Sequence, residues 1–258
     1  MSAKSASEIN PKDIVEGLGK GLRVIEAFDD DHSRLTASQA AELAGLTRTA
    51  ARRHLLSLVH FGYAASDGRQ FWLLPRVLRL GQSYLGAARL PRLVLPFIQR
   101  VSQQCGETVN VSVLDGHEIV YVARSNPPRW MSIGYQVGMR VPAHVVTPGV
   151  VILSTWRDAE VRQWIGAHHF SSFTAQTVTE PRSFAAEVDA ARQQGFWATA
   201  GQLDAAFGGI SVPLIDRKGE CKGAVGMTVL SSNYNPQAMQ EQLLPLLRDA
   251  AQLLRPLL

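Results

Sequence analysis

The chain has 258 residues, 46% of them hydrophobic and 19% charged, which favours two domains of about 100 to 200 residues and excludes a disordered chain. No apolar run approaches the roughly 18 residues of a membrane span, and residues 1–10 lack the apolar core of a signal peptide, so we expect a cytoplasmic protein with no membrane partner. The net charge is only +4, yet residues 34–100 carry ten arginines against Glu42 and Asp67, a local balance of +8 that indicates a polyanion-binding module.

Three short helices are predicted at the start of the chain. Apolar residues at spacings of four, three and three form the apolar stripe of a first helix within 17–31: Leu18, Leu22, Ile25 and Phe28. The second helix begins at Thr36, which has Gln39 three residues later as in a capping box, and ends at Gly45. The third begins after Thr47, a candidate N-cap. Two short helices joined by a tight turn that starts with glycine predict a helix-turn-helix, whose later helix enters the DNA major groove.

A β-hairpin is predicted directly after the third helix. Strand-like runs at 62–65 and 70–73 flank an Asp-Gly turn at 66–69, which completes a winged helix with Arg69 at the tip of the wing. Arginine binds phosphate or a guanine edge through two hydrogen bonds, so the polar side chains of this module are candidate contacts to a double-stranded DNA operator. They are Thr36, Thr47, Arg48, Thr49, Arg52, Arg53 and Arg69. A helical bundle whose arginines only keep it in solution explains this ordered set of motifs less well.

The rest of the chain is predicted as a linker helix and an α+β domain. Apolar residues recur at helical spacing through 75–104, with four arginines that lie either along DNA or against a partner subunit: Arg76, Arg79, Arg89 and Arg92. Strands are expected at 109–113, 119–122, 131–137, 196–199, 210–215 and 223–230, and helices at 149–156, 158–168, 183–194 and 236–258. This order predicts an antiparallel sheet with helices packed on it. We therefore divide the chain into a winged helix-turn-helix domain (1–74), a linker helix (75–90) and a C-terminal domain (91–258).

Several of these motifs resemble the IclR family of bacterial transcriptional regulators, over residues 17–258. Within the family the sequence is most similar to the subgroup that includes the PcaU, PcaR and PobR regulators of aromatic-acid catabolism. The motifs that carry the resemblance are GLRVIEAF (21–28), LAGLTRTAARR (43–53), FWLLPRVLRLG (71–81) and VLDGHEIVYVARS (113–125). The resemblance implies a C-terminal effector-binding domain, a homodimer or homotetramer on palindromic or repeated operator sites, and control by a small aromatic or other organic acid such as hydroxybenzoate or protocatechuate.

The resemblance also implies an effector pocket against the sheet of the C-terminal domain. By motif its lining comprises Trp130, Ile133, Thr147, Pro148, Thr199, Phe207, Gly209, Gly226 and Thr228. Trp130 and Phe207 are expected as apolar walls for an aromatic ring, and three nearby cations are candidate partners of its carboxylate: Arg129, Arg140 and His144. The stretches VVTPGV (145–150) and AFGG (206–209) depart from the family pattern, which indicates a remodelled pocket. For each single position, ordinary core packing is an equally good interpretation.

Enzyme activity and a cofactor are not expected. The segment GLGKG (17–21) lacks the preceding strand and the Lys-Ser/Thr pair of a phosphate loop, and no GxSxG motif is present. His168 and His169 point to different faces of a helix end, which favours surface histidines over a shared metal. Cys105 and Cys221 have no CxxC partner, which predicts neither a disulfide framework nor a zinc site. Two alternatives stay open: a small-molecule sensor or degenerate enzyme domain with an N-terminal protein-interaction module, and a hydrolase acting on the sensed molecule.

Overall fold

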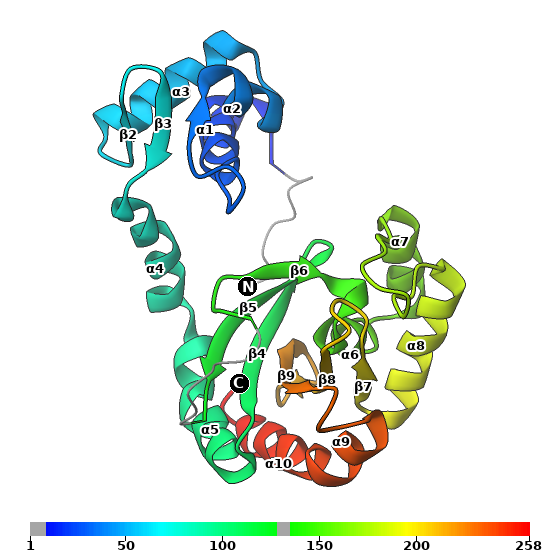
Figure 1. The fold of residues 1–258 in the computed structure, drawn as a ribbon. Helices are drawn as coiled ribbons and strands as arrows, with labels where there is room; N and C mark the ends of the chain where they lie inside the picture. Colours follow the sequence, from blue (N-terminus) through cyan, green and yellow to red (C-terminus); the bar gives the residue numbers. More distant parts are fainter. Residues whose placement is uncertain (1–8, 128–134) are drawn as a thin grey trace. The chain divides into compact units, whose positions relative to one another are not determined.

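The computed structural model describes residues 9–127 and 135–258. Backbone contacts divide the chain into two compact units, Met1–Ser83 and Tyr84–Leu258, which are described separately (Figure 1). The dividing point falls inside helix α4 (Leu78–Ala87), within the predicted linker, while the domain bounds 1–74, 75–90 and 91–258 stay predictions. No helix in either described stretch is long and apolar enough to cross a lipid bilayer.

The N-terminal unit contains a helix-turn-helix. Its helices are η2 (Pro11–Asp13), α1 (Glu16–Glu26), α2 (Ala37–Leu43) and α3 (Arg48–His60). The Thr36 hydroxyl accepts a bond of 3.3 Å from the Gln39 N–H, and Gln39 Oε1 accepts one of 2.9 Å from the Thr36 N–H, which confirms the capping box. Thr47 caps α3, accepting a bond of 3.3 Å from the Ala50 N–H. Gly45 has a φ of +63° and makes the turn between α2 and α3.

A small antiparallel sheet forms the wing, in the order β1-β3-β2. Its strands are β1 (Leu35–Thr36), β2 (Ala64–Ser66) and β3 (Gln70–Leu73). The predicted hairpin is confirmed, whereas β1 was not predicted, because two residues are too few to show an alternating pattern. Val24, Leu35, Leu55 and Phe71 are buried together, so the helices and the sheet share one core.

Two helices follow the wing. The turn η3 (Pro75–Val77) leads into α4, and α5 (Arg89–Cys105) comes next. Ala88 between them is extended, with a ψ of 127°, which separates α4 from α5. Pro91 lies in the first turn of α5, where a missing N–H costs nothing, and Gly106 ends the helix in the left-handed conformation.

The C-terminal unit is built on a six-stranded antiparallel sheet, in the order β6-β5-β4-β9-β8-β7 (Figure 1). Its strands are β4 (Thr108–Asp115), β5 (Glu118–Ser125), β6 (Arg140–Pro142), β7 (Trp197–Ala200), β8 (Phe207–Ile215) and β9 (Cys221–Leu230). Its further helices are η4 (Ala143–Val145), α6 (Thr147–Leu153), α7 (Asp158–Ala167), α8 (Pro181–Gln194), α9 (Pro236–Gln242) and α10 (Leu244–Leu254). The last strand, β9, pairs with both β4 and β8 and so joins the early and late hairpins at the centre of the sheet.

Each face of this sheet packs into its own core. Helices α5, α9 and α10 cover one face, where Ile98, Ile210, Val225 and Leu247 are buried. Helix α6 covers the other face, with α7 and α8 beyond it, and this second core includes Ile119, Leu153, Trp164 and Phe184. Successive side chains of a strand point to opposite faces, so the same strands serve both cores. The pocket described below lies on the α6 face.

Two predicted elements differ from the structure. Of the strand expected at 131–137, residues 131–134 lie outside the described part of the chain, and 135–137 are not strand; the edge strand β6 follows them. The single helix expected at 236–258 is two helices, α9 and α10, with Leu243 between them. Pro245 lies in the first turn of α10, and because proline lacks an N–H and disfavours a helical residue before it, a new helix begins there.

Candidate DNA-binding and effector-binding sites

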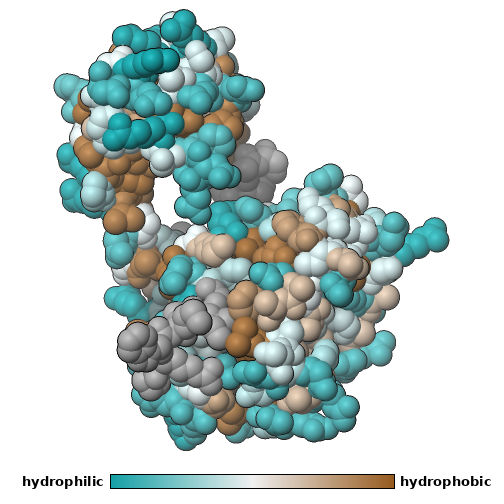
Figure 2. Space-filling model, viewed as in Figure 1, coloured by the Kyte–Doolittle hydropathy of each residue, from teal (hydrophilic) through white to brown (hydrophobic). Residues whose placement is uncertain are grey.

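The polar residues predicted on α3 share one exposed side of the helix. They are Thr47, Arg48, Thr49, Arg52 and Arg53. Ala51 and Leu55 on the opposite side are fully buried in the core. Within the described residues Arg48, Arg52 and Arg53 form no ion pair. Hydrophilic side chains cover much of the N-terminal unit (Figure 2). Unpaired guanidinium groups on one helix face are suited to phosphate and base-edge contacts.

The wing presents Arg69 at its tip. Asp67 Oδ1 accepts bonds of 2.8 Å from the Gln70 N–H and 2.9 Å from the Arg69 N–H, which shape the turn and lower the pKa of the Asp67 carboxyl. The Arg69 side chain itself is exposed. Arg76, which the sequence placed either along DNA or against a partner subunit, donates a bond of 2.9 Å to the Phe61 carbonyl and lies over the Tyr63 ring. Its side chain therefore stabilises the start of the wing. Thr36 belongs to β1, the strand that pairs with β3 of the wing, and its hydroxyl is already in the capping box.

A pocket lies on the sheet face that α6 covers, at the N-terminal end of that helix. The pocket together with the solvent-filled space at its mouth amounts to about 490 Å³. The structure brings together here the predicted residues Thr147, Pro148, Thr199, Phe207, Gly209, Gly226 and Thr228. These residues come from α6, β7, β8 and β9, and they become neighbours through the pairing of the strands and the packing of α6 on the sheet. Trp130, Ile133 and Arg129 lie outside the described residues.

Two glycines on neighbouring strands form the floor of the pocket. Gly226 on β9 pairs with Asn110 on β4 and with Ser211 on β8, and Gly209 lies in the next row of the sheet. A Cβ on Gly226 would lie 2.1 Å from Ser211 Oγ and 2.7 Å from the Ile210 carbonyl oxygen; because the backbone cannot move away easily, this position requires glycine. A Cβ on Gly209 would lie 3.3 Å from Thr147 Oγ1. The Thr147 and Ser211 hydroxyls are 2.7 Å apart, lie next to these glycines and join α6 to the sheet.

An aromatic wall that the sequence analysis did not identify borders the pocket. The rings of Tyr121 and Tyr135 stack with centroids 4.9 Å apart and an angle of 22° between their planes. Burial raises the pKa of Tyr121 well above its usual value and that of Tyr135 to about 12, so both phenols are neutral at physiological pH. Asn110 and Gln202, also missed, add buried amide groups to the lining. No local motif marks these residues, because they reach the pocket through strand register and a loop.

Two cations expected beside an effector carboxylate point elsewhere. Arg140 Nε lies 2.7 Å from Glu118, and Arg140 Nη2 lies 2.9 Å from Asp115, so its charge is paired at the edge of the sheet. His144 is fully buried against His168 and Phe170. Neither residue lines the pocket. The expectation that they pair with a carboxylate there is therefore corrected: neighbouring acids hold Arg140, and a second polar cluster holds His144.

That cluster is a chain of hydrogen-bonded histidines. His168 Nε2 lies 2.7 Å from His144 Nδ1, and His168 Nδ1 lies 3.2 Å from His117 Nδ1. His144 Nε2 donates a bond of 3.0 Å to the Ser171 carbonyl, which fixes the direction: His168 Nε2 donates to His144, and His117 donates to His168. Burial and the neighbouring histidines lower the pKa of His168 to about 4. His168 is partly buried in this cluster, whereas the predicted surface histidine His169 is exposed. Among the described residues no group of His, Cys, Asp or Glu is arranged to bind a metal.

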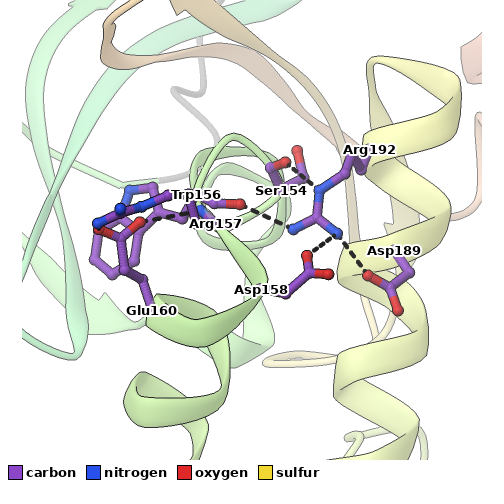
Figure 3. A network of polar contacts seen from close by, with 7 residues as sticks. All are labelled: Ser154, Trp156, Arg157, Asp158, Glu160, Asp189 and Arg192. Atoms are coloured by element: carbon purple, nitrogen blue, oxygen red, sulfur yellow. Dashed lines mark hydrogen bonds and ion pairs between the residues drawn. The ribbon is translucent and has the colours of Figure 1, made fainter.

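A single arginine fixes the far end of the helix that lines the pocket. Arg192 on α8 donates bonds of 3.0 Å to the carbonyls of Ser154 and Trp156, and its Nη1 lies 3.0 Å from Asp158 and 2.8 Å from Asp189 (Figure 3). Ser154 is the C-cap of α6, so Arg192 joins α6 to the start of α7 and to α8. Helix α6 is therefore held by the sheet at its pocket end and by Arg192 at its other end.

A winged helix-turn-helix followed by an α+β unit with a pocket defines a class of DNA-binding transcriptional regulators that carry a small-molecule-binding domain. Residues 17–68 match the IclR helix-turn-helix domain, and residues 82–255 match the C-terminal domain of bacterial IclR transcriptional regulators. The chain belongs to the IclR family of bacterial transcriptional regulators.

Three relatives are closely similar. The p-hydroxybenzoate hydroxylase transcriptional activator of Acinetobacter baylyi is 38% identical, over 98% of this chain and 95% of that protein. The Pca operon regulatory protein of the same organism is 31% identical, over 97% and 91%. The solved inducer-binding domain of a PobR double mutant from Acinetobacter, in complex with 3-hydroxybenzoic acid, is 31% identical, covers 66% of this chain and 100% of that one, and has a TM-score of 0.63.

Proposed function

We propose that the pocket beneath α6 binds a small aromatic acid of the hydroxybenzoate class, and that this binding changes the affinity of the regulator for its operator. The observation that carries the proposal is the pocket itself, which is lined by the stacked Tyr121 and Tyr135 rings and by glycines of the sheet. A flat aromatic wall with a few hydroxyl and amide groups fits a ring with polar substituents. The relatives support the class, since one is named for p-hydroxybenzoate hydroxylase and another binds 3-hydroxybenzoic acid.

The acid group of such an effector would meet neutral donors in the described lining. Thr147, Thr199 and Ser211 supply hydroxyls, and the described part of the lining holds Asp204 but no lysine, arginine or histidine. We therefore expect effector affinity to depend weakly on ionic strength. DNA binding, which releases counterions from phosphate, should depend on it steeply.

For the N-terminal unit we infer that α3 enters the major groove, with Arg48, Arg52 and Arg53 toward DNA and Arg69 on a phosphate or in an adjacent groove. The protein would act in the cytoplasm on catabolic genes, as a homodimer or homotetramer on repeated half-sites, without a cofactor. It would bind its effector without turnover. The segment 75–90 would serve as the linker through which effector binding resets the spacing of two winged helices.

Operator affinity with and without 4-hydroxybenzoate tests the proposal directly. Fluorescence anisotropy over a range of salt concentrations should show steep salt dependence and a change of affinity when the effector is added. Unchanged affinity together with unchanged DNA bending at saturating effector would refute the control mechanism. Weak salt dependence would favour a protein-interaction module instead, and consumption of the effector would contradict binding without turnover.

A further inference from the structure

The pocket contains a buried hydrogen-bond acceptor that no described residue satisfies. Asn110 is 4% exposed and lines the pocket from β4. Its Nδ2 donates a bond of 3.3 Å to Thr228 Oγ1, but its Oδ1 is shielded from solvent and has no partner among the described residues. Trp197 Nε1 and Ser231 Oγ share this condition, yet neither belongs to the pocket lining. A buried acceptor without a donor costs free energy, and a ligand donor would recover it.

The residue opposite this amide carries no side chain of its own. Directly across the ladder from Asn110 lies Gly226, and the Ser211 hydroxyl takes the place where its Cβ would lie, at 2.1 Å. The Ser211 hydroxyl bonds to Thr147, and Thr228 Oγ1 accepts the bond from the Asn110 amide nitrogen, so neither contacts Asn110 Oδ1. The group best able to reach Asn110 Oδ1 is therefore a donor on a molecule held in the pocket.

We infer that Asn110 is a specificity-determining residue that accepts a hydrogen bond from the ring hydroxyl of the effector. The effector class is then an aromatic acid with a donor on the ring, bound with this hydroxyl at the sheet and its acid group away from Asn110. An analogue without the hydroxyl leaves Asn110 Oδ1 unpaired and is rejected. This inference rests on the proposed function, because it assigns one end of the ligand in the same pocket.

The test compares three probes of similar shape: 4-hydroxybenzoate, 4-fluorobenzoate and benzoate. Calorimetry on the full chain should give 4-hydroxybenzoate an affinity at least about tenfold above that of the other two, as expected when a buried acceptor gains or lacks its donor. In Asn110→Ala this preference should fall to about twofold or less while benzoate binding is retained. Ser112→Ala, at the next buried position on the same face of β4 and outside the pocket lining, should keep the wild-type preference.

Asn110→Leu, which fills the site with an apolar side chain, provides a second variant if the alanine variant does not fold. Equal binding of 4-hydroxybenzoate and 4-fluorobenzoate by the wild-type protein would overturn the assignment, and so would an unchanged preference in the Asn110 variants. Wild-type binding of none of the three probes would instead refute the proposed function of the pocket, and the assignment with it.

Discussion

Lowering the pH is expected to destabilise the C-terminal unit through His168. This ring is neutral in the folded protein, and burial with the neighbouring histidines lowers its pKa from 6.5 to about 4. As the pH falls, the unfolded chain therefore takes up a proton before the folded one does. The stability contributed by His168 is fully present above about pH 6.5 and is lost as the pH falls toward about 4.

The size of the effect follows from the two pKa values. Between about pH 7.5 and about pH 5, a shift of this size corresponds to about 2 kcal/mol of unfolding free energy. His168 is only partly buried, and solvent screening reduces the expectation to about 1 kcal/mol. Burial lowers the pKa of His144 as well, which acts in the same direction.

Urea unfolding of the wild-type protein, His168→Gln and His169→Gln at the two pH values measures this contribution. Tryptophan fluorescence is a suitable signal, since four of the five tryptophans lie between Tyr84 and Leu258. Glutamine keeps a hydrogen-bond donor and an acceptor but takes up no proton. His169→Gln is the control, because His169 is the neighbouring residue and is exposed. His168→Gln should lose about 1 kcal/mol less than the other two proteins on acidification. Equal losses in all three would refute the reasoning.

Three further changes have defined outcomes. Arg52→Ala is expected to weaken operator binding in anisotropy titrations by about 1 to 3 kcal/mol if Arg52 reads a guanine, whereas an equal loss on every DNA sequence would make it a phosphate contact. Gly226→Ala places a Cβ 2.1 Å from Ser211 Oγ and should lower the unfolding free energy by about 1 to 3 kcal/mol. The control Gly166→Ala, which has open space around it in α7, should change the unfolding free energy little, and a larger loss in Gly166→Ala than in Gly226→Ala would contradict the glycine floor. Arg192→Met leaves two carbonyls without their donor and should cost about 1 to 3 kcal/mol in urea unfolding, and unchanged stability would mean that packing alone holds α6.

The winged helix could be predicted from sequence because its signals are local. Thr36 and Thr47 mark helix starts through bonds that span three residues, and the Asp67-Gly68 turn defines a hairpin of adjacent residues. The family resemblance supplied the pocket residues of α6, β7, β8 and β9, including Gly226. Its geometry as a glycine floor emerged only with the strand register.

What sequence reasoning missed depends on contacts between distant segments. Asn110 faces the pocket because β4 pairs with β9, more than a hundred residues later in the chain. His144 is a plausible partner for a carboxylate in sequence, yet His117 and His168, brought in by other elements, draw it into a different cluster. Helix periodicity likewise gave one final helix where Pro245 starts a second. Periodicity identifies the elements, but side-chain partners across a sheet follow from its register.

The two strands under the pocket present alternate residues to opposite sides. On β9, Gly226 and Thr228 face the pocket, while Val225, the residue before Gly226, is buried in the other core. A substitution at Val225 can therefore shift the pocket floor without touching a ligand. Apolar substitutions in the core on the far side of the sheet can therefore alter which inducer the regulator accepts. Selections for an altered inducer response should recover substitutions in that core as well as in the pocket.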